Sequence, residues 1–578
     1  MAIEIYGIDL GTTYSVISEL DDNGNPQPIP NQYDGTNTLP SAVYFPEDSD
    51  IPIFGKAAKA EKDISPDRVF EFVKRYIGKP DAPEYTVDGK TYNPVTISAL
   101  YLKRMKDYAE ESGNRKVENV VITCPAYFGH EERTATRQAG EMAGLNVLNI
   151  VNEPTAAALC YCSNQFPENQ KILVYDLGGG TFDVTLVDFT VKPDGTSVVK
   201  VLDTDGNDRL GGIDWDERLE KYMYEQYAEE SGIEIQDLDE ELKAIINAEA
   251  ESIKIKLSSL DNASTTIKYD GDRTKISVTR EDFENRTADL VNQTMAFVKQ
   301  LLDKTSHTPD DVDIVLLVGG STHMPMIKPA VEELFPGKVQ IHEPDLAVSK
   351  GAVIAANLKL QEIIAAVQEK SQKNETISDD NPWTDLEGFS EDDTTKIIDT
   401  LRNGGDLTEL TQGNTTGSTI STVNIISRSL GPVVVIDEAL VIDNLLFVGQ
   451  DEPAEAEEVY GTRFDNQEEI FVEVYENMSK EKRVTPDKDI KGNQQYVDPS
   501  LKIKSIGGVH LALQPNMPAN SPIKVIFKSS SNGLEVIAID LTSGKQAEVT
   551  IDYESALSQE ELKTAKEEIS GMKTAGQI

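Results

Sequence analysis

Two short segments of the chain each place an aspartate at the end of an apolar stretch and small residues directly after it. Asp9 is followed by Leu10-Gly11-Thr12-Thr13, and Asp176 by Leu177-Gly178-Gly179-Gly180-Thr181. A strand that ends in such a turn exposes backbone N–H groups, and glycine lets the backbone approach a phosphate closely. Each aspartate can hold a hard cation through water. This repeat, with aspartates 167 residues apart, predicts a duplicated fold that closes on one nucleotide from both sides and hydrolyses ATP.

A third glycine turn, Gly319-Gly320-Ser321-Thr322, follows the apolar run 314–318 and suits the sugar, base or α-phosphate end of a nucleotide. The chain contains no GxxxxGK[ST] sequence, which excludes the P-loop class. Three strand-turn sites and an internal duplication indicate instead the superfamily of actin, hexokinase and the chaperone ATPases. The expected fold class is therefore α/β, with two lobes around a nucleotide cleft.

Periodicity supplies the elements that would position these turns. Residues 1–358 alternate strand-like and helix-like segments, which is typical of α/β architecture. Strands are predicted over 120–123, 172–175 and 314–318, and helices over 97–111, 131–143, 215–231, 238–260 and 281–304. We expect this actin-like ATPase domain to end at residue 358.

Beyond residue 358 the composition changes twice. Residues 361–412 carry 13 acids against 4 bases, so 359–419 is predicted to be an acidic linker or insert, with helical pieces near 361–370 and 391–402 and a turn at 414–419. The domain 420–553 reads as an antiparallel sandwich, with strands over 433–436, 445–448, 470–474, 523–527 and 534–539 and a hairpin turn at 531–533. A short amphipathic helix is expected over 556–572, within the terminal segment 554–578.

The charge and cysteine content limit the classes of partner and location. The chain of 578 residues has 100 acids and 54 bases, a net charge of −46, which disfavours nucleic acid and anionic membranes as partners. We interpret the acidity as a solubility or salt adaptation of solvated faces rather than as recognition of a partner. The sequence has no apolar run of 18 residues, which argues against a membrane span, and its first strand near residue 3 leaves no room for a signal peptide. Its three cysteines are too few for a disulfide framework. These features predict a cytoplasmic protein. Cys160 and Cys162 are expected to be buried thiols rather than a metal or redox site.

Several segments resemble the heat-shock-70 (DnaK-type) chaperone family. They are Gly7 to Thr13, Val73 to Gly78, Ile122 to Phe128, Asn152 to Leu159, Asp176 to Asp183, Leu210-Gly211-Gly212 and Val318 to Thr322. Their order and spacing fit this family across residues 1–358, and together they form a very specific signal. The resemblance implies an ATPase whose nucleotide state controls the binding of unfolded polypeptide.

The same resemblance implies the roles of the residues in the cleft. Asp9 and Asp176 would hold hydrated Mg²⁺, Lys74 would face the γ-phosphate and attacking water, and Glu153 would orient that water or the metal shell. Thr181 would lie beside the γ-phosphate, and Asp183 would be a nearby acid, with a potassium ion as in relatives. Phosphate-binding positions are Gly11, Thr12, Thr13, Gly178, Gly179, Gly180, Gly211 and Gly212. From its sequence alone, Lys74 would be taken for a snorkelling lysine.

For the nucleoside, the spacing of Glu251, Lys254 and Ser258 places them on one helix face. By resemblance they contact adenosine, and the pocket is completed by Gly319, Gly320, Ser321 and Asp345. Without the family, Glu251 and Lys254 would be interpreted as a surface ion pair. His323 stands where many relatives carry an arginine stacked on adenine, so we expect a stacked histidine and a weaker or pH-sensitive affinity for the base.

Pro125 and Arg133 match the family's relay between nucleotide cleft and substrate domain, although a proline after a strand and an arginine at a helix start are also common structural features. In the β-domain, Tyr460 and Ile470 align with positions of the peptide groove, and core strand residues are an equally good interpretation. About 25 residues follow residue 553, enough for the first turns of the family's helical lid, so fast peptide release is expected.

Three functions are compatible with these features. The first is an ATP-dependent chaperone that takes unfolded polypeptide, works with a nucleotide-exchange factor and alternates between ATP and ADP. Asn149 replaces the arginine that contacts J-domain cochaperones in the family, which argues against an ordinary J-protein partnership. The second is a nucleotide-gated scaffold for one dedicated protein partner, favoured by the unusual linker, the short terminal segment and Asn149. The third, a sugar or acetate kinase, lacks any identifiable acceptor site.

Overall fold

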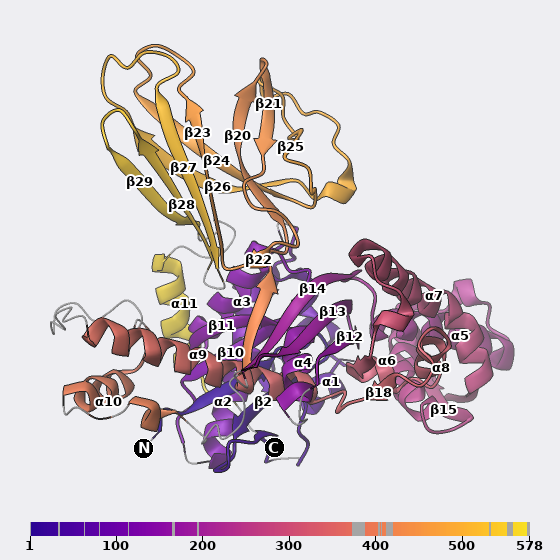
Figure 1. The fold of residues 1–578 in the computed structure, drawn as a ribbon. Coiled ribbons are helices and arrows are strands. Elements are labelled where there is room, and N and C mark those ends of the chain that lie inside the picture. Colours follow the sequence, from indigo (N-terminus) through magenta and orange to yellow (C-terminus); the bar gives the residue numbers. More distant parts are fainter. Residues whose placement is uncertain are drawn as a thin grey trace.

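In the computed structural model the N-terminal half is built on two sheets with the same topology (Figure 1). The structure describes residues 2–574 apart from 33–34, 63, 80, 114, 164–167, 194–195, 373–385, 387, 403–404, 406, 412–419, 531–532 and 552–558. The predicted turn at 414–419 lies outside these described residues.

The first sheet has the order β11-β10-β1-β2-β3, and β4 (Leu39–Pro40) pairs with β2. Its strands are β1 (Ile5–Asp9), β2 (Tyr14–Leu20), β3 (Pro26–Pro28), β10 (Asn119–Cys124) and β11 (Asn146–Asn152). β1 and β2 are antiparallel, whereas β10 and β11 join β1 in parallel. The same antiparallel pair and the same parallel neighbours occur in the second sheet.

That second sheet has the order β18-β17-β12-β13-β14-β19-β22. Its strands are β12 (Gln170–Leu177), β13 (Phe182–Val191), β14 (Ser197–Asn207), β17 (Ile314–Val318), β18 (Val339–Ile341), β19 (Ile420–Ile425) and β22 (Asp451–Glu452). β12 and β13 form the antiparallel pair, and β17 and β18 follow in parallel. The predicted duplication and the α/β fold class are thereby confirmed. The last two strands come from beyond residue 419 and extend this sheet at its β14 edge.

Two helices pack together between the sheets. α4 (Glu153–Ser163) and α9 (Ala347–Gln372) share one apolar cluster with strands of both sheets. They approach so closely that a Cβ on Gly351 would lie 1.7 Å from the carbonyl oxygen of Ala156, so only glycine fits there. Cys160 and Cys162 of α4 are buried, as predicted, and neither forms a disulfide.

The outer helices confirm the periodicity analysis. The first sheet packs with α2 (Pro94–Gly113) and α3 (His130–Met142), and the second with α5 (Gly212–Ser231), α6 (Glu240–Leu257), α7 (Arg280–Thr305) and α8 (Ile327–Leu334). The hairpin of β15 (Asn262–Tyr269) and β16 (Asp272–Thr279) belongs to the same cluster as α5 and α6. No helix in the described part of the chain is long and apolar enough to cross a membrane.

The acidic segment after residue 360 is more than a linker. The two predicted helices exist, one as the last turns of α9 and the other as α10 (Glu391–Arg402). Ile364, Ile397, Leu407 and Leu410 are buried in the cluster between the sheets. These apolar residues are few but regularly placed, and they attach the segment to the ATPase core.

The C-terminal domain is a sandwich of two antiparallel sheets, seen at the top of Figure 1. One sheet has the order β25-β21-β20-β24-β26, from β20 (Ser429–Ile436), β21 (Ala439–Asp443), β24 (Glu469–Asn477), β25 (Arg483–Val484) and β26 (Lys504–Ala512). The other has the order β23-β27-β28-β29, from β23 (Ala454–Gly461), β27 (Pro522–Ser530), β28 (Gly533–Asp540) and β29 (Gln546–Ile551). The two sheets enclose one apolar core.

One predicted strand is wrong and two other expectations hold. Residues 445–448 form a bend with a single bridge at Leu446, because the backbone N–H groups of Leu445 and Leu446 both donate to the carbonyl oxygen of Leu430. The hairpin is confirmed by the pairing of β27 with β28 up to Ser530 and Gly533, although its turn residues lie outside the described part. The terminal helix exists as α11 (Gln559–Gly571), and it packs on α2 and α3 rather than on the sandwich.

Candidate active site

The two repeated turns meet across the cleft. Gly11 to Thr13 join β1 to β2, and Gly178 to Thr181 join β12 to β13. A Cβ on Gly179 would lie 2.2 Å from Thr13 Oγ1, and one on Gly180 would lie 2.5 Å from Thr12 Cγ2. The glycines thus let two backbones and two threonine side chains share a space that any larger residue would fill.

A third and a fourth loop complete this cradle. A Cβ on Gly211 would lie 2.6 Å from the backbone nitrogens of Gly180 and Thr181, just before α5 begins at Gly212. The hydroxyl of Ser321 donates to the carbonyl oxygen of Gly178 at 2.9 Å. All three predicted glycine turns therefore converge on one place in the structure.

A buried group of acids lies under the loops with one lysine. Lys74, in the 3-10 turn η2 (Val73–Tyr76), donates to Glu153 Oε1 at 2.5 Å, and both side chains are buried. Burial and the neighbouring Glu153 raise the pKa of Asp9 to about 7. Burial and Glu153 also raise the pKa of Asp176 and of Asp183 well above the usual range. The group thus holds more acids than its one lysine can neutralise.

This donor set fits a hydrated hard cation. Neither carboxylate oxygen of Asp183 has a hydrogen-bond partner among the described residues, and that carboxylate is buried. The cleft acids do not form a group with the spacing of direct metal ligands; within the described chain that spacing occurs at Cys160, His342 and Glu343. A cation that keeps its waters and touches the carboxylates through them matches both observations.

The structure adds functional residues to which the sequence assigned no role. Arg75 donates to the carbonyl oxygen of Gly180 at 2.9 Å and pairs with Asp214 at 3.1 Å, so it joins the second phosphate loop to α5. Lys59, on α1 (Lys56–Ala60), pairs across the cleft with Glu251 on α6. Arg75 lies inside a quoted motif and could have been considered, whereas nothing in the sequence relates Lys59 to a residue 192 positions away.

The predicted nucleoside residues lie around the cleft, and each has a partner within the protein. Glu251 contacts Lys59 and Tyr14, and Lys254 contacts Asp216 at 2.6 Å, so the surface ion pair considered for Glu251 and Lys254 is not formed. Ser258 is the C-cap of α6, and its hydroxyl donates back to the Lys254 carbonyl oxygen at 3.3 Å.

His323 pairs with Asp345 beside the third glycine turn. Its Nε2 lies 3.0 Å from Asp345 Oδ2, and this hydrogen bond raises the pKa of His323. A Cβ on Gly320 would lie 3.1 Å from the same carboxylate, while Gly319 has a φ of 84° and lies against Asp176. The histidine is thus held by an acid, with half of its side chain exposed.

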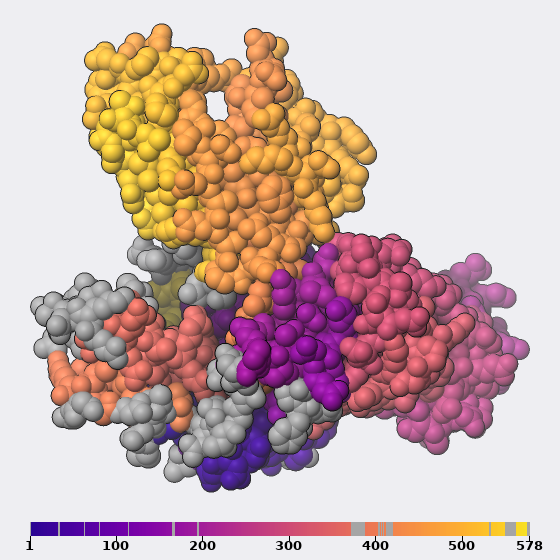
Figure 2. Space-filling model, viewed as in Figure 1, coloured from indigo at the N-terminus to yellow at the C-terminus, as the bar shows by residue number. Residues whose placement is uncertain are grey.

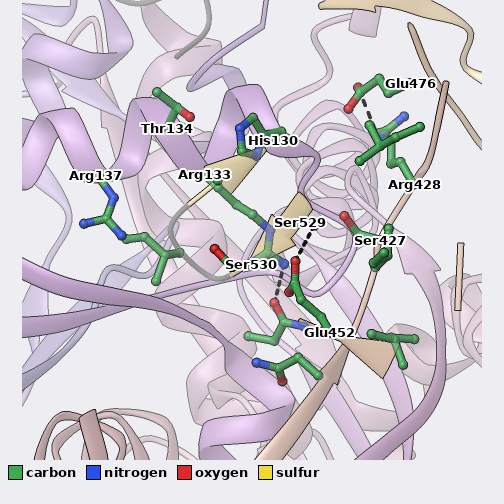
Figure 3. Close-up of a pocket in the computed structure, with 17 residues that line it drawn as sticks. His130, Arg133, Thr134, Arg137, Ser427, Arg428, Glu452, Glu476, Ser529 and Ser530 are labelled. Carbon is green, nitrogen blue, oxygen red and sulfur yellow. Dashed lines mark hydrogen bonds and ion pairs between the residues drawn. The ribbon is translucent and has the colours of Figure 1, made fainter. Parts of the chain in front are cut away.

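Arg133 connects the cleft to a pocket between the two domains, shown in Figure 3. It lies on α3 and donates to the Phe128 carbonyl oxygen at 3.0 Å and to the Asn152 side chain, next to Glu153. Pro125 accepts a hydrogen bond from the Phe128 backbone at 3.2 Å. The opposite wall of the pocket comes from the β-domain, where Arg428 pairs with Glu476 at 3.6 Å.

Tyr460 and Ile470, the two predicted groove residues, pack at the margin of the sandwich core. The Tyr460 hydroxyl donates to Asp443 Oδ2 at 2.8 Å. Figure 2 shows an opening through the β-domain beside the β20–β21 hairpin. Val459 and Phe464, to which the sequence pattern assigned no role, are exposed apolar side chains of this domain.

Two sheets of one topology whose glycine loops close on a single acidic cleft define an actin-like, nucleotide-binding ATPase. The family model described as Hsp70 protein matches residues 5–369. The chain is 38% identical over 387 residues to chaperone protein DnaK of Thermosipho melanesiensis, covering 66% of this chain and 62% of that protein. It is 31% identical over 568 residues to chaperone protein DnaK of Thermotoga petrophila, covering 97% and 82%. The chain therefore belongs to the Hsp70 family of ATP-hydrolysing chaperones.

Proposed function

We propose that ATP is hydrolysed in the cleft between the two sheets and that the bound nucleotide controls the affinity of the β-sandwich for extended, unfolded polypeptide. The observation that carries this proposal is the convergence of three glycine loops over one lysine and a surplus of buried acids. Backbone N–H groups at such loops bind phosphates, and buried acids next to them bind the accompanying cation.

In this proposal Asp9 and Asp176 hold Mg²⁺ through its waters. When bound, the ion neutralises charge on the phosphates. Thr12, Thr13 and the glycine loops donate hydrogen bonds to phosphate oxygens, and Thr181 lies beside the terminal one. Asp183, whose carboxylate lacks a partner in the described chain, would take K⁺.

Lys74 and Glu153 act on the attacking water. Although burial opposes it, Glu153 and Asp9 raise the pKa of Lys74, so this lysine stays charged and can stabilise negative charge at the terminal phosphate. Glu153 is held at 2.5 Å from Lys74 and orients the water in line with the bond that breaks.

Coupling to the β-domain would run through Arg133. Its bond to Asn152 lies one residue from Glu153, and the neighbouring Glu131 pairs with Lys504 of the β-domain. Further ion pairs join Lys200 to Asp451 at 2.6 Å and Lys480 to Asp203 at 3.6 Å. A nucleotide that moves Glu153 therefore has a short path to this interface.

The peptide would bind where the β-domain is open and presents apolar side chains. We place the protein in the cytoplasm, where its three cysteines, none of which forms a disulfide, would stay reduced. A nucleotide-exchange factor is a further expected partner, and Asn149 makes an ordinary J-domain contact a poor expectation.

The test measures ATP turnover and peptide affinity together. Unfolded peptides should stimulate turnover and should bind more tightly with ADP than with ATP. Val459→Asp is expected to weaken peptide binding while leaving unstimulated turnover unchanged, because Val459 is an exposed residue of β23 in the β-domain and is not part of the cleft. Indifference to every peptide in a library would contradict the proposal and favour the dedicated scaffold.

A further inference from the structure

A second group of chemically reactive side chains lies outside the nucleotide site. Cys160 lies on α4, and His342 and Glu343 directly follow β18. Cys160 Sγ is 3.9 Å from His342 Nε2, and one ligand atom from each of Cys160, His342 and Glu343 lies within 4.8 Å of the other two. Within the described chain this is the one group of three whose ligand atoms are so close together.

These three ligand types suit a borderline-soft divalent ion. Zn²⁺ takes thiolate, imidazole and carboxylate ligands in tetrahedral geometry. With Zn–S near 2.3 Å and Zn–N near 2.0–2.1 Å, a tetrahedral angle gives an S···N separation of about 3.6 Å. The observed 3.9 Å would have to shorten by only about 0.3 Å.

The surroundings already orient the ligands. The ring of His342 packs edge-to-face on Tyr161, with ring centroids 5.3 Å apart and planes at 89°. The Glu343 carboxylate pairs with Lys350 at 2.7 Å, so it is turned toward α9. Cys160 is fully buried, whereas His342 and Glu343 reach solvent, which leaves an entry path for an ion.

We propose that Cys160, His342 and Glu343 bind one Zn²⁺ ion, with water as the fourth ligand. Binding displaces the thiol proton of Cys160 to solvent and replaces Lys350 as the partner of Glu343. The ion would connect α4, which begins at the cleft residue Glu153, to the segment after β18, which contains the nucleoside-site residue Asp345.

The test titrates Co²⁺, as a spectroscopic substitute for Zn²⁺, into the full-length, chelator-treated protein without nucleotide. One Co²⁺ per chain should bind with the near-ultraviolet absorption of a thiolate-to-cobalt charge transfer, and Zn²⁺ should displace it. Carboxylates on the acidic surface can also bind Co²⁺, but they lack sulfur and give no such band.

Variants assign the ligands. Cys160→Ser and His342→Gln should each lose the band and weaken Zn²⁺ binding at least about 100-fold, beyond the 10–100-fold typical of outer-shell residues. Cys162→Ser is the matched control, since it removes a second buried thiol from the same helix and should keep the band. His342 is only half buried, so its variant decides the matter if Cys160→Ser fails to fold.

Two results would overturn the site. The first is Co²⁺ binding to the wild type without a charge-transfer band. The second is a band that survives in His342→Gln or disappears in Cys162→Ser. Either outcome would leave Cys160 and His342 as a simple thiol–imidazole hydrogen bond.

Discussion

Replacing Lys59 by methionine is expected to accelerate ADP release about fivefold. Lys59 lies on α1 in the lobe of the first sheet, and its partner Glu251 lies on α6 in the lobe of the second. Release requires the lobes to separate, and this pair spans the cleft between them. Methionine keeps the aliphatic length of the lysine and removes only its charge.

The magnitude follows from the exposure of the pair. The Lys59 and Glu251 side chains are 25% and 29% exposed, so water screens them partly. Exposed pairs contribute about 0.2–1 kcal/mol, and this one, with Tyr14 also donating to Glu251 at 3.4 Å, belongs at the upper end. About 1 kcal/mol corresponds to roughly a fivefold shift in the population of open lobes, since about 1.4 kcal/mol gives tenfold.

The assay follows dissociation of a fluorescent ADP analogue in a stopped-flow instrument. Lys62→Met is the control. Lys62 pairs with Glu71 at 2.6 Å within the first lobe and forms no ion pair with the second lobe among the described residues, so this variant removes the same charge without breaking an ion pair between the lobes. Added salt should speed release from the wild type more than from Lys59→Met, since screening weakens the pair that the variant lacks. Equal release rates from Lys59→Met and Lys62→Met would show that the Lys59–Glu251 pair does not hold the lobes together.

Three further predictions concern the cleft and the domain interface. Lys74→Ala should reduce single-turnover hydrolysis at least about 100-fold and largely preserve nucleotide binding, because a charge aimed at the transition state is lost; wild-type turnover would disprove its assigned role. Gly211→Ala should slow hydrolysis about 100-fold. The new Cβ would lie 2.6 Å from backbone atoms of Gly180, so the loop must move by about 1 Å. Gly571→Ala is the control, because its Cβ would point into open space, and this variant should behave as wild type. Burial raises the pKa of Glu476 from 4.5 to about 7. The folded protein therefore loses stability as the pH rises from about 4.5 to about 7, because the charged carboxylate is disfavoured in its buried site. Glu476→Gln should therefore raise the thermal unfolding midpoint at pH 8 and not at pH 5, and an equal effect at both values would contradict this.

The elements that carry the cleft could be predicted because local chemistry dictates them. Asp9 is the last residue of β1 and Asp176 the last but one of β12, and the glycines after them are required where a Cβ would meet another loop. Their convergence followed from the duplication, since two copies of one strand-turn motif lie in equivalent places of two equivalent sheets. The helices were found because their apolar residues recur every three or four positions.

The rest depends on contacts between distant parts of the chain. Residues 445–448 are apolar and all but Phe447 are buried, which is equally true of a strand, but the backbone N–H groups of Leu445 and Leu446 both donate to Leu430. β19 adds to β14 from beyond the acidic segment, and no periodicity indicates which sheet a strand will join. Lys59 and Glu251 illustrate the same limit for side chains, because each reads as an ordinary surface charge until the lobes bring them together.

The placement of Arg133 explains how one small movement could reach both domains. Its guanidinium binds the Phe128 carbonyl oxygen and the Asn152 side chain, so it fixes the end of β11 against the start of α3. α4 begins at the next residue, Glu153, which Lys74 holds from the cleft side. The first turn of α3 contains Glu131, which Lys504 of the β-domain holds from the other side. Because these groups are packed within two adjoining helix starts, the proposed coupling predicts that a shift of Glu153 toward a bound phosphate is transmitted to the Glu131–Lys504 contact.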